Sequence, residues 1–185
     1  MTFLHSLVAP FFAVAVSLAL PGTAQAVGSD STEPPKPTQT TTKCEEGLIW
    51  DDKEKKCVKI QDSRLDDDTL FGAVRELAYA GRLTDAEATL ARMTEGDSDR
   101  VLTYRGYLAR KQGRIEEGMA FYDAALKANP DNLLARSYMG QGLVEQGELQ
   151  LASAQLDEII TRGGAGTWAE EALRLAIETG QTATY

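Results

Sequence analysis

A glycine-led step recurs three times along the chain at nearly constant spacing, and no other feature restricts the fold as strongly. The steps begin at Gly81 (GRLTDA), Gly113 (GRIEEG) and Gly147 (GELQLA), which places their starts 32 and 34 residues apart. From residue 67 onward, apolar residues follow a helical period without strand-like alternation. A period near 34 residues with a glycine turn predicts an array of stacked helix pairs.

The clearest unit spans residues 99–132. Its first helical segment holds Leu102, Gly106 and Ala109, its second holds Gly118, Tyr122 and Ala125, and Pro130 closes it. This pattern resembles the tetratricopeptide repeat (TPR) family, and the whole chain looks like an exported bacterial TPR protein. The resemblance covers residues 67–179. It implies a fold without built-in chemistry, because function in such arrays resides in particular side chains.

The resemblance implies an all-α fold for residues 65–180. We expect a right-handed α-solenoid of about three TPR helix pairs plus a C-terminal capping helix, preceded by a small disulfide hairpin. The capping helix is predicted at residues 167–179, with Thr167 as its N-cap and Trp168 on its apolar face. Where helices cross, larger side chains would separate the backbones, and small residues are predicted there: Gly106, Gly118, Gly140 and Ala152.

Residues 1–26 carry the pattern of a secretory signal peptide. An uncharged apolar stretch of 14 residues, 7–20, precedes the small-x-small sequence Ala24-Gln25-Ala26 that signal peptidases accept. The stretch is too short to cross a hydrocarbon core of ~30 Å as a stable helix. We therefore expect cleavage after Ala26 and a periplasmic or secreted protein with no membrane span after cleavage.

Two further segments lack a hydrophobic period. Residues 27–43 are rich in Pro and Thr and predict a disordered linker, and residues 181–185 form a short tail.

An acidic run at residues 62–68 precedes the first long helix, with Asp66 or Asp67 as its expected N-cap. A divalent-metal loop is the other interpretation of this run, but the glycine turn and distal Glu of a calcium hand are missing.

Cys44 and Cys57 are expected to form a disulfide, because an exported chain meets oxidising conditions. The apolar segments 48–50 and 58–60 flank a polar turn at 51–56, which predicts a hairpin within residues 44–60. Closing this loop stabilises the fold by roughly 3 kcal/mol in the chain-entropy model. A redox pair or a metal site is the alternative, but the spacing is not C-x-x-C. Neither a metal nor another cofactor is expected.

Composition argues against several classes of function. The chain has 19 Lys and Arg against 28 Asp and Glu, a formal charge of −9, which disfavours binding to a nucleic-acid backbone. The single histidine, His5, lies in the predicted signal peptide, so histidine-dependent catalysis and histidine-ligated zinc are not expected after export. No pair of carboxylates stands out as catalytic, so we do not expect an enzyme.

The TPR resemblance also implies a concave groove lined by the first helix of each pair. The positions carried over to this sequence as partner-binding residues are Arg75, Tyr79, Arg100, Thr103, Tyr107, Arg110, Lys111, Tyr138 and Gln141. Arg forks and Tyr rings together suit an extended peptide with acidic residues or a free C-terminus. Tyr107 stands where the carboxylate-clamp subtype has Asn, which argues against a chaperone-tail ligand.

Two other interpretations of these positions remain open. In one, the cations pair with Asp and Glu on the same helix faces. In the other, Tyr122 and Tyr138 pack between repeats instead of facing a ligand. The leading functional hypothesis is a non-catalytic adaptor or scaffold that binds a protein or peptide in its groove. The alternatives are a structural self-association module and a cell-wall glycan-binding protein that acts through the Cys44–Cys57 loop and its Trp50.

Overall fold

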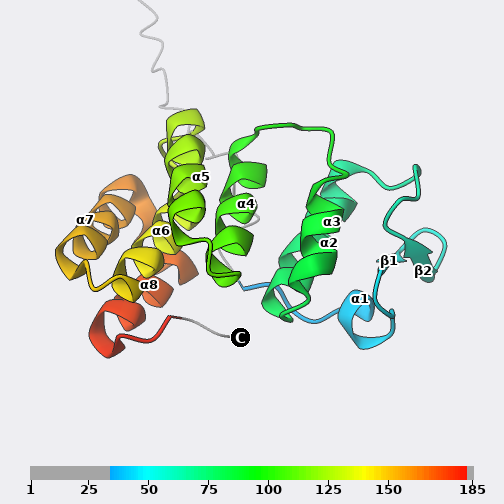
Figure 1. Ribbon diagram of the computed structural model, residues 1–185, viewed down its shortest axis with the longest axis horizontal. Coiled ribbons are helices and arrows are strands. Elements are labelled where there is room, and N and C mark those ends of the chain that lie inside the picture. Colours follow the sequence, from blue (N-terminus) through cyan, green and yellow to red (C-terminus); the bar gives the residue numbers. More distant parts are fainter. Residues whose placement is uncertain (1–33, 183–185) are drawn as a thin grey trace, which may run out of the picture.

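The computed structural model describes residues 34–182, so the predicted signal peptide, residues 27–33 of the linker and most of the tail lie outside the described part. Helices dominate it, and a two-stranded hairpin stands at one end (Figure 1). The helices are α1 (Gln39–Thr42), α2 (Asp67–Tyr79), α3 (Leu83–Leu90), α4 (Asp99–Lys111), α5 (Ile115–Ala128), α6 (Leu133–Glu145), α7 (Leu149–Ile159) and α8 (Trp168–Thr179), with a π-helical turn, η2 (Ile160–Gly164). No described helix is long and apolar enough to cross a bilayer.

The recurring glycines terminate the first helix of each pair. Gly81, Gly113 and Gly147 adopt φ values of +76°, +82° and +80°, a left-handed conformation that glycine reaches without steric cost. In each turn the amide of the next residue donates to a carbonyl in the preceding helix at 2.9 Å: Arg82 to Leu77, Arg114 to Ala109 and Glu148 to Leu143. Three equivalent helix-ending turns therefore produce the 32- and 34-residue spacing.

The prediction of small residues at helix crossings is confirmed at Gly106, Gly118 and Gly140. A methyl group on Gly106 would lie 2.5 Å from the Tyr122 ring, and one on Gly118 would lie 2.9 Å from the Gly106 carbonyl oxygen. These distances show that α4 and α5 touch through their backbones. At Gly140 the space belongs to Leu173 of α8, whose side chain would lie 2.6 Å from an added methyl group.

The predicted hairpin and its disulfide are confirmed. Strands β1 (Leu48–Asp51) and β2 (Lys56–Lys59) pair antiparallel, with Trp50 opposite Cys57. The Cys44–Cys57 bond joins Cα atoms 5.6 Å apart. Ile49 and Val58 are buried and belong to the same apolar core as α2 and α4. The hairpin is thus packed onto the helices and shares their core.

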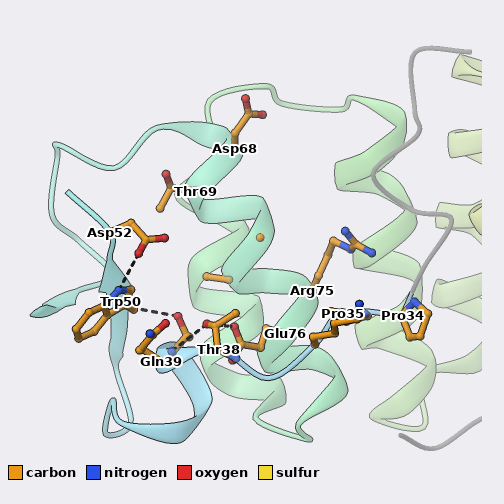
Figure 2. A pocket seen from close by; sticks show the side chains of 14 residues that line it. Pro34, Pro35, Thr38, Gln39, Trp50, Asp52, Asp68, Thr69, Arg75 and Glu76 are labelled. Carbon is orange, nitrogen blue, oxygen red and sulfur yellow. Dashed lines mark hydrogen bonds between the residues drawn. The ribbon is translucent and has the colours of Figure 1, made fainter. Parts of the chain in front are cut away.

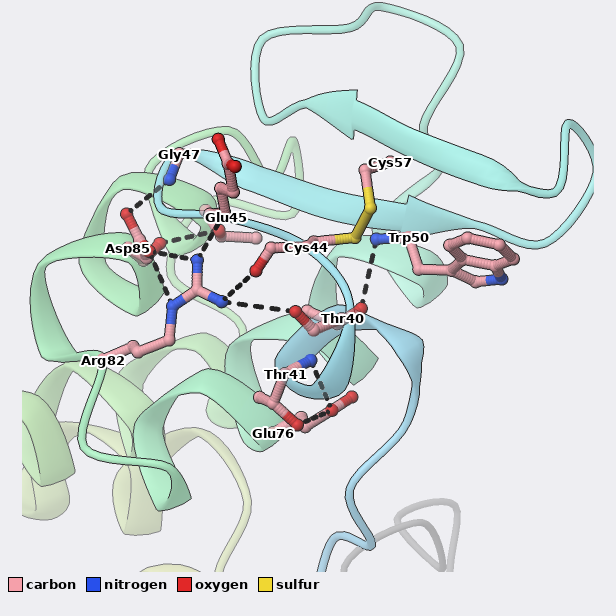
Figure 3. Close-up of polar contacts among 11 residues, drawn as sticks. Thr40, Thr41, Cys44, Glu45, Gly47, Trp50, Cys57, Glu76, Arg82 and Asp85 are labelled. Atoms are coloured by element: carbon pink, nitrogen blue, oxygen red, sulfur yellow. Dashed lines mark hydrogen bonds and ion pairs between the residues drawn. A yellow bond between two sulfur atoms is a disulfide. The ribbon is translucent and has the colours of Figure 1, made fainter.

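The linker prediction needs correction over residues 38–43. Thr38 caps α1, and its amide and hydroxyl both donate to the buried Glu76 of α2 at 2.6 Å (Figure 2). The Thr41 amide donates to the same carboxylate at 3.0 Å (Figure 3). A buried carboxylate is costly unless several donors surround it, and this segment supplies them. Contacts made with α2 therefore order a segment that has no apolar pattern of its own.

Arg82, at the start of α3, holds the same segment from the other side. Its guanidinium donates to the Thr40, Cys44 and Glu45 carbonyl oxygens at 3.2, 3.0 and 2.8 Å, and it pairs with Asp85 at 2.6 Å (Figure 3). We call Glu76, Arg82 and Asp85 the hairpin clasp, because together they attach α1 and the cystine loop to the first helix pair.

Two predicted helix caps are confirmed. The Asp66 side chain accepts from the Thr69 amide at 2.9 Å and begins α2. Thr167 accepts from the Glu170 amide at 3.4 Å and begins α8. Each cap satisfies an amide that a helix N-terminus otherwise leaves unpaired.

Alanine at Gly106 or Gly118 is expected to lower the free energy of unfolding by about 1–3 kcal/mol, because the added methyl group meets the Tyr122 ring or the α4 backbone. Gly72 of α2 is the matched control. A methyl group there has nothing within 4 Å, so Gly72→Ala should raise stability by roughly 0.5–1 kcal/mol. Urea denaturation measures all three variants. Equal effects at the three glycines would contradict the close crossing of α4 and α5.

Candidate functional site

Four aromatic rings from four helices meet in one cluster: Tyr79 of α2, Tyr107 of α4, Tyr138 of α6 and Trp168 of α8. Tyr79 and Tyr107 stack with centroids 5.7 Å apart and planes within 4°, and Tyr107 lies 4.8 Å from Tyr138. The Trp168 ring centroid lies 6.0 Å from that of Tyr79 and 6.1 Å from that of Tyr138, so each of the four rings contacts two others. We call these four residues the aromatic cluster.

The structure thus brings together three predicted groove residues and adds a fourth. Tyr79, Tyr107 and Tyr138 come from the first helix of successive pairs, as the sequence predicts. Trp168 was assigned only to the apolar face of the capping helix. Its position next to the cap Thr167 gives no local signal that the ring reaches α2.

Burial divides the cluster into an inner and an outer part. Tyr107 is 4% exposed and Tyr138 is 1% exposed, whereas Tyr79 and Trp168 are half-buried. Tyr138 also contacts Tyr104 and Tyr122, both fully buried, so the interpretation that Tyr122 and Tyr138 pack between helix pairs is confirmed. Burial raises the pKa of Tyr107 and of Tyr138, so both phenols stay neutral at physiological pH.

Two predicted groove residues are buried and make hydrogen bonds inside the protein. Thr103 is 1% exposed, donates to the Asp99 carbonyl oxygen at 2.6 Å and accepts from Asn132 at 3.1 Å. Gln141 is 1% exposed and donates to the Ser137 hydroxyl at 3.3 Å. Both side chains therefore make hydrogen bonds inside the helix packing.

Arg100 and Arg110 are paired with carboxylates, as the first of the two open interpretations holds. Arg100 bonds Glu95 at 2.7 Å and Asp68 at 2.9 Å. Arg110 has a buried side chain and bonds Glu145 at 2.6 Å. Burial alone would raise the pKa of Glu145, but the nearby Arg110 holds it below its usual value.

Lys111 differs from these arginines. Its amine lies 5.7 Å from the centroid of the Tyr107 ring, the same distance as the Arg110 guanidinium, and it makes no ion pair with any residue of 34–182. Burial, reinforced by Arg110, lowers the pKa of Lys111, and the nearby Glu145 carboxylate partly offsets this effect. A half-buried cation that makes no direct ion pair and lies beside an aromatic ring can bind an incoming carboxylate.

Arg75 occupies a different place. It is half-buried on α2 and lines a separate cavity between α2, the hairpin and the segment at residues 34–40 (Figure 2). Its positive charge partly offsets the burial that raises the pKa of Tyr104. Arg75 therefore stands between this cavity and the tyrosine core.

Nothing in the described residues resembles a metal centre: no group of three or more His, Cys, Asp or Glu lies close enough together within residues 34–182. Comparisons with known proteins supply no identity, since no family model, no curated protein and no solved structure matches the chain. The aromatic cluster and its neighbours are therefore the features of the structure that indicate a function.

Glu145→Gln is expected to lower the free energy of unfolding by about 1–3 kcal/mol at neutral pH, because the buried Arg110 loses its counter-charge. The folded-state pKa of Glu145 is depressed, so its stabilisation is present above the unfolded-state pKa and is lost as the pH falls. The difference between wild type and variant should shrink on acidification in urea titrations. Glu116→Gln, an exposed control on α5, should change stability by less than ~0.5 kcal/mol at any pH.

Proposed function

We propose that this chain is an exported, non-catalytic binding module of the tetratricopeptide type, an adaptor or scaffold that holds a partner's peptide segment. The single observation that carries the proposal is Lys111. It is a half-buried cation that makes no direct ion pair with any residue of 34–182, and it lies over Tyr107 at the edge of the aromatic cluster. Desolvated cations of this kind favour ligands that bring their own negative charge.

The aromatic cluster supplies the second half of the proposed recognition. Tyr79 and Trp168 are half-buried, and each contacts a buried ring, Tyr107 for Tyr79 and Tyr138 for Trp168. Rigid rings bind apolar side chains with little loss of conformational entropy. The proposed ligand is therefore a short peptide with an apolar residue for the rings and a carboxylate, either a side chain or a free C-terminus, for Lys111.

The other groove cations have a positioning role in this proposal. Arg110 already pairs with Glu145, and Arg100 with Glu95 and Asp68. Arg110 next to Lys111 raises the local positive potential without being available as a direct partner. Of the predicted groove residues, Tyr79 and Lys111 are thus the proposed contacts, and Arg110 acts through Lys111.

Lys111→Gln is expected to weaken binding of apolar–acidic peptides about tenfold, the loss of one charge-assisted contact. Peptide arrays bearing such sequences with free or amidated C-termini identify the probe, and fluorescence anisotropy measures its affinity. Lys127→Gln, an exposed lysine on α5, is the matched control and should bind like wild type. Affinity should fall as the pH rises through the lowered pKa of Lys111, because the amine loses its charge. Equal binding by both variants, or no peptide binding, would refute the proposal.

Self-association is a second candidate, and one observation favours it. Large apolar side chains are exposed on the last part of the array, at 40–54% of their surface: Leu149, Leu151, Ile160 and Leu175. Such side chains on neighbouring helices mark association surfaces when they form a continuous patch.

If the candidate holds, the wild-type mass in sedimentation equilibrium rises with concentration, and the double variant Leu151→Glu, Leu175→Glu stays monomeric. Glutamate at these positions places charge where a partner copy would bury apolar surface. A wild-type mass that is monomeric at all concentrations would remove this candidate.

A further inference from the structure

A second site lies apart from the aromatic cluster, in a cavity of about 620 Å³ between the hairpin, the segment at residues 34–40 and α2 (Figure 2). This volume falls within the range of small-ligand sites. Its floor is built from small residues, because Gly72 and Ala73 of α2 line it and a methyl group on Gly72 would meet nothing within 4 Å. The hairpin clasp determines the shape of the cavity, since it sets the position of the hairpin against α2.

Trp50 forms the aromatic wall of the cavity. Its indole Nε1 donates to Asp52 at 3.0 Å, and its backbone amide donates to the Thr40 hydroxyl at 3.2 Å. The Lys43 amine lies 5.5 Å from the ring centroid, and Lys43 is not among the residues that line the cavity. Asp52 and Lys43 therefore hold the ring, Thr40 fixes the backbone beneath it, and Trp50 remains half-exposed.

The ionisable residues of the cavity are two cations, Lys36 and Arg75, and three carboxylates. One of the carboxylates, Glu76, already accepts hydrogen bonds from Thr38 and Thr41. Asp52 is bonded to the Trp50 indole and Asp68 to Arg100. The excess of carboxylates disfavours an anionic ligand, and all three carboxylates already accept hydrogen bonds, which weakens their attraction for a cation. A neutral ligand with many hydroxyl groups fits this lining.

Gln39 provides an uncommitted polar group. Its side-chain amide is half-buried on the cavity wall and makes no hydrogen bond with any other residue of 34–182. An amide presents both a donor and an acceptor, which suits a pair of neighbouring hydroxyl groups. A sugar ring carries hydroxyl groups at its edge and C–H groups on its face, and the face matches the apolar surface of an indole.

We propose that this cavity is a binding site for a neutral oligosaccharide, with a sugar ring stacked on Trp50 and its hydroxyl groups bonded to Gln39 and Asp52. The site is independent of the peptide site proposed above, because none of its lining residues belongs to the aromatic cluster and Lys111 is not among them. A chain with both sites would connect a glycan to a protein partner.

Isothermal titration calorimetry and saturation-transfer NMR with two probes, a tetramer of N-acetylglucosamine and a tetramer of glucose, test the proposal on the purified full chain. Wild type should bind at least one probe. Trp50→Ala should weaken binding at least tenfold, and Gly72→Leu should abolish it, because leucine fills the floor while the Trp50 ring stays intact. Ala120→Leu, which adds the same side chain at an exposed position of α5, and Lys111→Gln should both bind like wild type.

Three results would overturn the proposal. One is no binding of either tetramer by the wild type at millimolar concentration. Another is binding that survives in both Trp50→Ala and Gly72→Leu, which would place the sugar elsewhere. The third is Trp50-dependent binding of peptides without saccharide binding, which would assign the cavity to a protein ligand. Circular dichroism of Gly72→Leu identifies any loss of fold.

Discussion

The close contact between α4 and α5 governs the interior of this protein. Gly106 and Gly118 let the two backbones touch, and this places Arg110 between Gly118 and Gly142. A methyl group added to Gly118 would lie 3.1 Å from the Arg110 amide nitrogen, and one added to Gly142 would lie 3.0 Å from the Arg110 Cδ. The guanidinium is thereby directed to Glu145 and toward Tyr107. The absence of three Cβ atoms thus sets the position of a buried charge, and through it the electrostatics around Lys111.

Different structures cover the two ends of the helical part of the described chain. At the N-terminal end, the hairpin clasp and the disulfide attach a polar segment to α2 and α3 through hydrogen bonds. At the other end, α8 covers α6 with an apolar face that includes Leu173, which fills the space above Gly140. Stacked helix pairs expose an apolar side at each end, and covering it is a requirement for solubility. Here one cover is the disulfide-linked hairpin, which adds Ile49 and Val58 to the apolar core beside its polar contacts, and the other is a helix.

Local chemistry made much of the fold predictable. The glycine turns, the caps at Asp66 and Thr167 and the cystine hairpin depend on residues within a few positions of one another. Glu76 and Trp168 depend on partners more than thirty residues away, so no local pattern indicates that a carboxylate will collect threonine donors or that an indole will reach a distant tyrosine. The groove positions show both outcomes: the tyrosines converge, whereas Thr103 and Gln141 are used for internal hydrogen bonds.

The contact between Tyr79 and Trp168 has a mechanical consequence. An array in which each helix touches only its neighbours behaves like a spring, because small changes at every interface add up to a large change in curvature. In this chain a ring from α2 contacts a ring from α8, so the first and last long helices are joined directly. Moving α2 away from α8 requires separating these two rings, and the contact therefore resists changes in the relative position of the two helices.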